Sequence, residues 1–173
     1  MTMNWLKKAL LTLTLAVLGA SSTQAADLAP PTGEILLTVS GAIAVKNHDD
    51  AAAFDLEGLK AIGEVTFSTT TPWTEGVQSF TGVSLQALME TVGVTEGTLI
   101  AKAINDYAIE IPVSDAVTDG PIIAYLQNGE PMSVREKGPL WLVYPYDSKA
   151  DYQAEVIYSR SIWQLTNIDI KAE

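Results

Sequence analysis

The side chains in this sequence that are best suited to chemistry are aromatic rings and a small number of cations. The candidates for one site are Trp73, Tyr107, Tyr146, Arg135 and Arg160. An aromatic face can stack on a flat heterocycle, and a guanidinium donates in a fixed fork to ring carbonyls or carboxylates. Together, these residue types predict a site that binds a planar organic ligand.

The tryptophans differ in their sequence neighbours. Trp73 stands in the polar stretch STTTPWTEG, whose small hydroxyls suit a polar pocket, so we expect it in the site. Trp141 and Trp163 stand in strand-like alternation, which favours core packing. Arg135 and Arg160 each suit either a surface ion pair or a ligand contact, and the residues alone leave both alternatives open.

Several catalytic chemistries are excluded or disfavoured by composition. The chain has no cysteine, so it offers no thiolate nucleophile and no thiolate metal ligand. The single histidine, His48, lies in the polar turn NHDD without a serine motif beside it, and no glycine-rich phosphate loop is present. The residues therefore favour a binding protein over an independent enzyme.

The first residues predict export. Lys7 and Lys8 precede an apolar run from Ala9 to Ala20, and small residues then end at Ala25, which is the pattern of a secretory signal. We expect a signal peptide at 1–25, a flexible proline-rich lead-in at 26–33, one domain at 34–173 and a periplasmic location. Removing the two lysines changes the net charge from −11 to −13. Such a surface repels nucleic acid and anionic lipid, and no membrane insertion is expected after cleavage.

The elements that must position the candidates are mostly strands. Runs at 34–41, 64–71, 98–105, 107–113, 121–132, 138–146 and 159–171 predict strands, and 42–47 is a candidate partner for the first. Asp55 predicts a helix over 56–63, and Ser84 predicts another that ends at Gly93. Asn105-Asp106 and Asn128-Gly129 are turn signals. The stretch 72–83 reads as a polar loop. The pattern predicts one α+β, mostly β domain with two short helices.

Four strings resemble the sulfite-oxidase-type molybdopterin-binding domain, a compact β-rich fold. In chain order they are FTGVSLQALM, NDYAIEIP, AYLQNGEPM and KGPLWLVYPY. The similarity extends over about residues 34 to 172. In catalytic members of this family, a cysteine about ten residues before the string that begins at Phe80 ligates molybdenum. That count reaches Thr70 here, and a neutral hydroxyl is a poor substitute for a soft thiolate.

The resemblance therefore implies a pterin-shaped pocket without the metal. The chain is most similar to the short, exported, cysteine-free branch of the family, which includes periplasmic pterin-binding regulators of the PruR type. What this branch implies is a reduced pterin of the monapterin or neopterin type as ligand, with the molybdenum cofactor not expected. The implied partner is the periplasmic sensory part of a membrane-bound cyclic-di-GMP enzyme.

The same resemblance suggests roles for individual residues. Trp73 would stack on the ring or cover it, Arg160 and Asp106 would pair with its polar edge, and Tyr107 and Tyr146 would line the pocket. Two other functions stay open at this stage. One is a molybdenum-dependent oxidoreductase, or a subunit of one, with an unusual ligand, and the other is an interaction module with a vestigial pocket.

Overall fold

The computed structural model describes residues 28–172, which form ten strands, three α-helices and three short 3₁₀ helices. In chain order they are β1 (Leu37–Gly41), β2 (Ala52–Phe54), α1 (Leu56–Ile62), β3 (Glu64–Thr69), β4 (Gln78–Ser84), α2 (Leu85–Val92), β5 (Thr98–Ala103), β6 (Ala108–Pro112), η1 (Val113–Asp115), β7 (Ile122–Gln127), β8 (Glu130–Pro131), β9 (Trp141–Val143), η2 (Tyr146–Ser148), η3 (Ala150–Tyr152), α3 (Glu155–Arg160) and β10 (Leu165–Lys171). The signal sequence expected at 1–25 lies outside the described residues.

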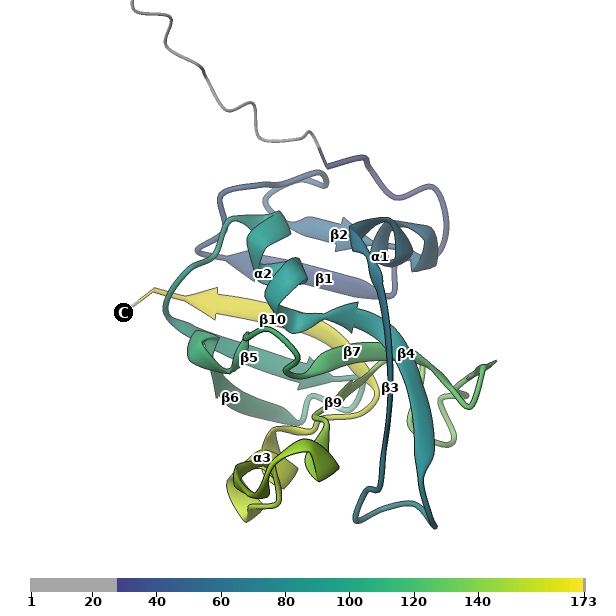
Figure 1. Cartoon of the computed structure of the whole chain (residues 1–173). Helices are drawn as coiled ribbons and strands as arrows, with labels where there is room; N and C mark the ends of the chain where they lie inside the picture. The colour runs from purple at the N-terminus through teal and green to yellow at the C-terminus, as the bar shows by residue number, and fades with distance from the viewer. Residues whose placement is uncertain (1–27, 173) are drawn as a thin grey trace, which may run out of the picture.

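The strands form two sheets (Figure 1). One sheet has the order β2-β1-β10-β5-β6, and the other has the order β3-β4-β7-β8 with β9 beside β7. β1 and β10 run parallel, and the other pairings of these strands are antiparallel. Helices α1 and α2 lie together at one end of the molecule and α3 lies at the opposite end (Figure 1). The predicted α+β, mostly β class is confirmed.

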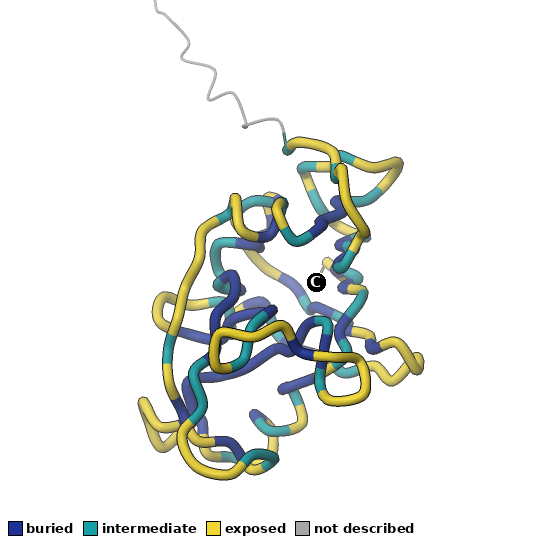
Figure 2. Tube along the Cα trace, turned by 90° about the vertical axis from the view of Figure 1, so that its right-hand side faces the viewer, coloured by how far each residue is buried: buried dark blue, intermediate teal, exposed yellow. Residues whose placement is uncertain are grey.

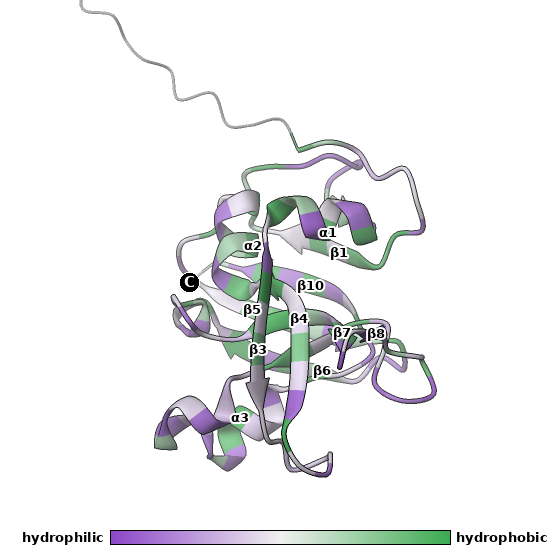
Figure 3. Ribbon diagram, turned by 45° about the vertical axis from the view of Figure 1, so that its right-hand side comes forward, coloured by the Kyte–Doolittle hydropathy of each residue, from purple (hydrophilic) through white to green (hydrophobic). Residues whose placement is uncertain are grey.

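The core is continuous and apolar. Buried segments run through the interior, while exposed residues gather in the outer loops and turns (Figure 2). Figure 3 shows hydrophobic residues concentrated in the central strands, whereas α3 carries a mixture of hydrophilic and hydrophobic residues. Trp141 is fully buried, as its strand-like alternation predicted. Within the described residues, no helix is long and apolar enough to cross a bilayer.

Helices α1 and α2 begin and end where the sequence predicts. The side chain of Asp55 accepts from the backbone N–H of Gly58 at 2.7 Å, and Ser84 Oγ accepts from Ala87 N–H at 3.0 Å. Gly93 ends α2 in the left-handed conformation, with φ +73°. The apolar face of α2 is buried, so capping and packing agree at this end of the fold.

The lead-in is described from residue 28 and is hydrogen-bonded to the domain. Asp55 Oδ2 accepts from the backbone N–H groups of Thr32 and Gly33 at 2.8 and 2.7 Å. Asn47 Nδ2 donates to Ala29 O at 2.8 Å. The backbone N–H groups of Gly58, Gly33 and Thr32, with that of Gly58 contributing most, hold the pKa of Asp55 below its usual range.

The strand expected at 42–47 is a wrong prediction, because β2 is the neighbour of β1. Gly41 has φ +86° and turns the chain away from the sheet. The next residues cross the end of α2, where Ala44 N–H and Val45 N–H donate to Val92 O at 2.9 and 3.2 Å. Tertiary contact with α2 therefore overrides the apolar pattern of this segment.

Strand β4 was missed, since the polar run around it reads as a loop. It pairs with β3 on one side and β7 on the other, and it carries the bend at Thr81/Gly82. A Cβ at Gly82 would lie 2.1 Å from the backbone oxygen of Ile123, so glycine is required where these two strands approach. The strands on either side supply the hydrogen bonds that make this weakly apolar segment extended.

The strand expected over 159–171 is also wrong in its first half. Residues 155–160 form the missed helix α3, and the strand starts only at Leu165. Gln164 has φ +54°, which breaks the alternation that the sequence pattern predicts. Trp163 consequently does not pack as a core residue: 37% of its surface is exposed.

Both turn predictions are confirmed. Asn128 and Gly129 have φ +53° and +82° between β7 and β8, as a two-residue hairpin turn needs. Asn105 and Asp106 lie between β5 and β6, and Asp106 has φ +63°. This second turn projects toward the end of the molecule that carries α3, where it contributes to the candidate site.

Candidate functional site

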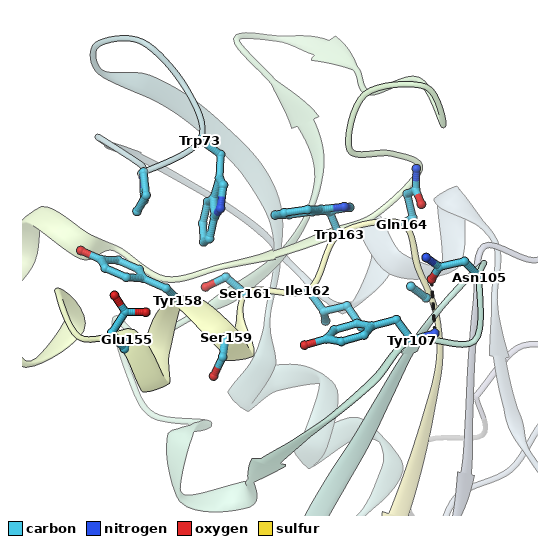
Figure 4. A pocket seen from close by; sticks show the side chains of 12 residues that line it. Trp73, Asn105, Tyr107, Glu155, Tyr158, Ser159, Ser161, Ile162, Trp163 and Gln164 are labelled. Carbon is cyan, nitrogen blue, oxygen red and sulfur yellow. Dashed lines mark hydrogen bonds between the residues drawn. The ribbon is translucent and has the colours of Figure 1, made fainter.

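A pocket of about 610 Å³ opens beside α3 (Figure 4). Three segments far apart in the sequence form it: the loop after β3, the β5–β6 turn, and α3 with the residues that follow it. Its lining comprises Pro72, Trp73, Ala103, Asn105, Tyr107, Glu155, Tyr158, Ser159, Ser161, Ile162, Trp163 and Gln164. The volume suits a small organic ligand, and such pockets combine apolar walls with a few polar groups.

Trp73 lies at the centre of an aromatic cluster at one wall of this pocket. Its ring makes edge-on contacts with four aromatic rings, whose centroids lie 5.5 to 6.2 Å away: Trp141, Tyr146, Tyr158 and Trp163. Thr71 Oγ1 accepts from the backbone N–H of Trp73 at 3.1 Å and pairs with Thr74 Oγ1 at 2.8 Å. The threonines around this tryptophan therefore fix the loop that presents it.

Tyr107 and Trp163 form other parts of the wall, with the pocket between them (Figure 4). Tyr107 is 52% exposed, and its backbone N–H donates to Asn105 Oδ1 at 3.2 Å. Of the predicted site residues, Trp73 and Tyr107 are the two that the structure brings into the lining. Their distance along the chain means that only the folded protein brings them together.

Tyr146 lies behind Trp73, outside the lining. It is 2% exposed, and its hydroxyl donates to Ser161 Oγ at 2.6 Å, which in turn donates to Ile157 O at 2.8 Å. Burial raises the pKa of Tyr146 above its ordinary value. This buried chain of hydrogen bonds joins α3 to the aromatic cluster, so Tyr146 supports the pocket wall without facing a ligand.

Arg160 is engaged in an ion pair, and the pocket lining does not include it. Its Nη1 lies 2.9 Å from Asp115 Oδ2, which also accepts from the hydroxyl of Tyr144 at 2.7 Å. Burial, followed by the hydrogen bond to Asp115, raises the pKa of Tyr144. Of the two alternatives that the sequence left open for Arg160, the structure places it in the ion pair.

The other predicted site residues also lie outside the lining. Asp106 is exposed at the tip of the β5–β6 turn, and Arg135 is exposed in the loop between β8 and β9. Thr70 donates to Asp147 through both its N–H, at 2.6 Å, and its Oγ1, at 2.7 Å. These two hydrogen bonds, with that of the N–H first, lower the pKa of Asp147. Thr70, which the residue count from Phe80 reaches, thus joins the end of β3 to η2.

Sequence reasoning missed most of the polar lining. Glu155, Tyr158 and Ser159 come from α3, where spacings of three and four residues bring side chains to one face. That spacing was the available signal, but α3 has no side-chain cap that would indicate where the helix begins. Asn105 was recognised as a turn residue, and its contribution to the pocket depends on where the turn lies in the fold.

A sequence model of the oxidoreductase molybdopterin binding domain matches residues 44–149. The chain belongs to this family. The matched range contains Trp73 and Tyr107 and ends before α3, so seven of the twelve residues that line the pocket of this molybdopterin-binding domain follow the matched range. No curated protein matches the chain.

The residues at this site do not fit the molybdenum-containing form of the family's cofactor. The chain contains no cysteine, and the hydroxyl of Thr70 is already donated to Asp147. In the described range 28–172, the lining includes no lysine, arginine or histidine that would pair with a cofactor phosphate. The same range holds no group of three or more His, Cys, Asp or Glu side chains placed for a metal. The aromatic walls instead suit a flat organic ring.

Proposed function

We propose that the protein is a periplasmic receptor for a reduced pterin and is not a catalyst. The observation that carries the proposal is the pocket itself: aromatic side chains on several sides, a small set of polar groups and no thiolate. Membership of the molybdopterin-binding family supports a pterin over other flat rings, because the family's cofactor contains that ring system. The signal-like sequence at 1–25 supports the periplasmic location.

The regulatory part of the proposal concerns a partner. As in PruR-type proteins, the receptor would act on the periplasmic part of a membrane-bound cyclic-di-GMP signalling enzyme. Ile104, Tyr107 and Val156 are 49, 52 and 52% exposed on the turn and helix that border the pocket. A partner that contacts these apolar side chains would sense whether the ring is bound, provided the bound and free forms interact with it differently.

Binding to mature protein tests the first part directly. Tetrahydromonapterin, added without oxygen, should raise the melting temperature to a limit set by saturation and quench tryptophan fluorescence with the same midpoint. Trp163→Ala should weaken binding about 5- to 150-fold, since stacking on an aromatic side chain contributes about 1–3 kcal/mol. Phe67→Ala, which truncates a half-buried aromatic outside the lining, is the matched control.

A second variant distinguishes a direct loss of binding from a loss caused by misfolding. The Tyr107 side chain is largely exposed, so Tyr107→Ala should weaken binding while leaving the unfolding midpoint nearly unchanged. Unchanged affinity in both pocket variants would remove this pocket as the site. Stoichiometric molybdenum in protein exported by its native host would overturn the receptor proposal. Failure to bind any reduced pterin, with the partner still captured, would leave the interaction module as the function.

A further inference from the structure

The pocket lining contains a negatively charged side chain and no positively charged one among the described residues. Glu155 is the charged member of the lining within residues 28–172, and no cation accompanies it there. The guanidinium of Arg160 is paired with Asp115 at 2.9 Å. Lys137 Nζ lies against the rings of Trp141 and Trp163, 5.3 and 5.8 Å from their centroids. The pocket therefore presents a carboxylate without a compensating charge in the lining.

The hydroxyls of the two lining serines, and one amide N–H of Gln164 at the opposite end of the pocket (Figure 4), are already used as donors within the protein. The side chains of Ser159, Ser161 and Gln164 donate to backbone carbonyl oxygens at 2.8, 2.8 and 2.6 Å. Each hydroxyl has one donor, so the two serines have lone pairs but no further donor to offer a ligand. A ligand that carries N–H donors would match the carboxylate and the serine lone pairs at this end (Figure 4), where the hydroxyl of Tyr158 can either donate or accept.

Glu155 is placed to receive such donors. Its carboxylate makes no hydrogen bond or ion pair with the residues described in 28–172. Figure 4 shows Glu155 with Tyr158 and Ser159 at one end of the pocket, while Asn105 and Gln164 lie at the other end. A ring held between the aromatic walls would thus meet a carboxylate at one end and an amide pair at the other.

We infer that Glu155 recognises the amino edge of the bound ring, so that the pocket selects an uncharged pterin over a lumazine and over a phosphorylated pterin. This inference rests on the proposed pterin-binding function. A pterin carries an amino group beside a ring N–H, two parallel donors that match the two oxygens of a carboxylate. In a lumazine an oxygen replaces the amino group, and that oxygen would face Glu155 with no proton between them. A ligand phosphate would meet a carboxylate and no cation.

The inference predicts that the protein prefers pterin to lumazine and that Glu155→Gln reduces this preference. We expect wild-type protein to bind a tetrahydropterin about 10- to 100-fold more tightly than the tetrahydrolumazine with the same side chain. Glu155→Gln should weaken pterin binding by a similar factor and leave lumazine binding equal or stronger, because the glutamine amide can donate to the ring oxygen. Isothermal titration calorimetry without oxygen measures all four affinities.

The control is Glu96→Gln, which makes the same charge change on an exposed residue between α2 and β5, outside the lining. It should leave both affinities unchanged. Glu155 is also in the first turn of α3, where a negative charge stabilises the helix through its interaction with the helix dipole. If Glu155 only stabilised the helix, Glu155→Gln would lower the melting temperature and weaken the binding of both ligands by the same factor. The ratio of the two affinities therefore separates the alternatives.

Salt concentration gives an independent readout. A pterin with a phosphorylated side chain should bind more weakly than the unmodified pterin at low salt, and the gap should narrow as salt screens the charges. If wild-type protein binds pterin and lumazine equally, or if Glu155→Gln keeps the preference, the inference is overturned while the receptor proposal stands. If wild-type protein binds neither ring, the receptor proposal itself fails.

Discussion

The two ends of this molecule are stabilised in different ways. At the end with α1 and α2, each helix starts at a capping side chain and packs an apolar face into the core. At the opposite end, α3 is only six residues long and has no side-chain cap. It is held by the hydrogen bond from Tyr146 to Ser161 and by the ion pair of Arg160 with Asp115.

This difference separates stability from binding. The α1–α2 end depends on neighbours in sequence and on buried apolar surface. The α3 end depends on residues 15 and 45 positions apart that meet through polar contacts. Its aromatic rings pack edge to face, and Trp163 keeps 37% of its surface exposed where the pocket opens. We therefore expect core substitutions at the α1–α2 end to change stability alone, and substitutions in the pocket lining at the α3 end to change ligand affinity.

The largest effect should come from the α1–α2 end. Leu88 is fully buried on α2, and Leu88→Ala should lower the free energy of unfolding by about 2–5 kcal/mol through lost burial and a residual cavity. Urea unfolding measures this loss. Folded Leu88→Ala should bind tetrahydromonapterin with wild-type affinity, and a large loss of affinity in the folded variant would contradict the separation of the two ends.

A smaller loss is expected from the ion pair at the α3 end. Arg160→Gln leaves the partly buried Asp115 without its charged partner and should lower the free energy of unfolding by about 1–3 kcal/mol. Ligand affinity should change less than threefold, because Arg160 is outside the lining and the hydrogen bond from Tyr146 to Ser161 still holds α3 in this variant. Arg135→Gln, on an exposed residue, is the control. A tenfold or greater loss of pterin affinity in Arg160→Gln alone would restore the ligand-contact role that the sequence left open.

The smallest effect concerns acid stability at the α1 cap. Hydrogen bonds lower the pKa of Asp55 in the folded state, so the unfolded chain takes up this proton first as the pH falls. The stabilisation is present above the ordinary value of 3.8 and is lost as the pH falls through the lower folded pKa. Asp55→Asn cannot titrate, so its urea midpoint should fall less steeply than that of wild type between about pH 5 and 2.5. Equal slopes would show that this cap does not contribute.

Local signals allowed the α1–α2 end and the turns to be predicted. Caps at Asp55 and Ser84, the apolar spacing of α2 and the Asn128-Gly129 turn each act within a few residues, and each was found where the sequence put it. β4 and α3 were missed because their signals are not local. β4 is extended because it lies between β3 and β7, and α3 is anchored through Ser161 and Arg160.

The candidate site divides in the same way. The polar neighbours of Trp73 favoured a position in a pocket, and the hairpin signal placed Tyr107 near a turn; both residues lie in the lining. Trp163 was mistaken for a core residue, because the positive φ of Gln164 interrupts the alternation that the prediction relied on. Glu155 gave no signal beyond its charge, and a surface carboxylate cannot be told from a pocket carboxylate until the helix that carries it is placed.

The sequence by itself determined the family, the mostly β class and the absence of a thiolate, since these follow from residue identities and from short-range patterns. Only the tertiary structure decided that Arg160 pairs with Asp115, that Thr70 is bound to Asp147, and that three distant segments enclose one pocket. The physical reason is that the partner of a side chain depends on which surfaces come into contact when the sheets pack. Contacts between residues tens of positions apart are not visible in short sequence patterns.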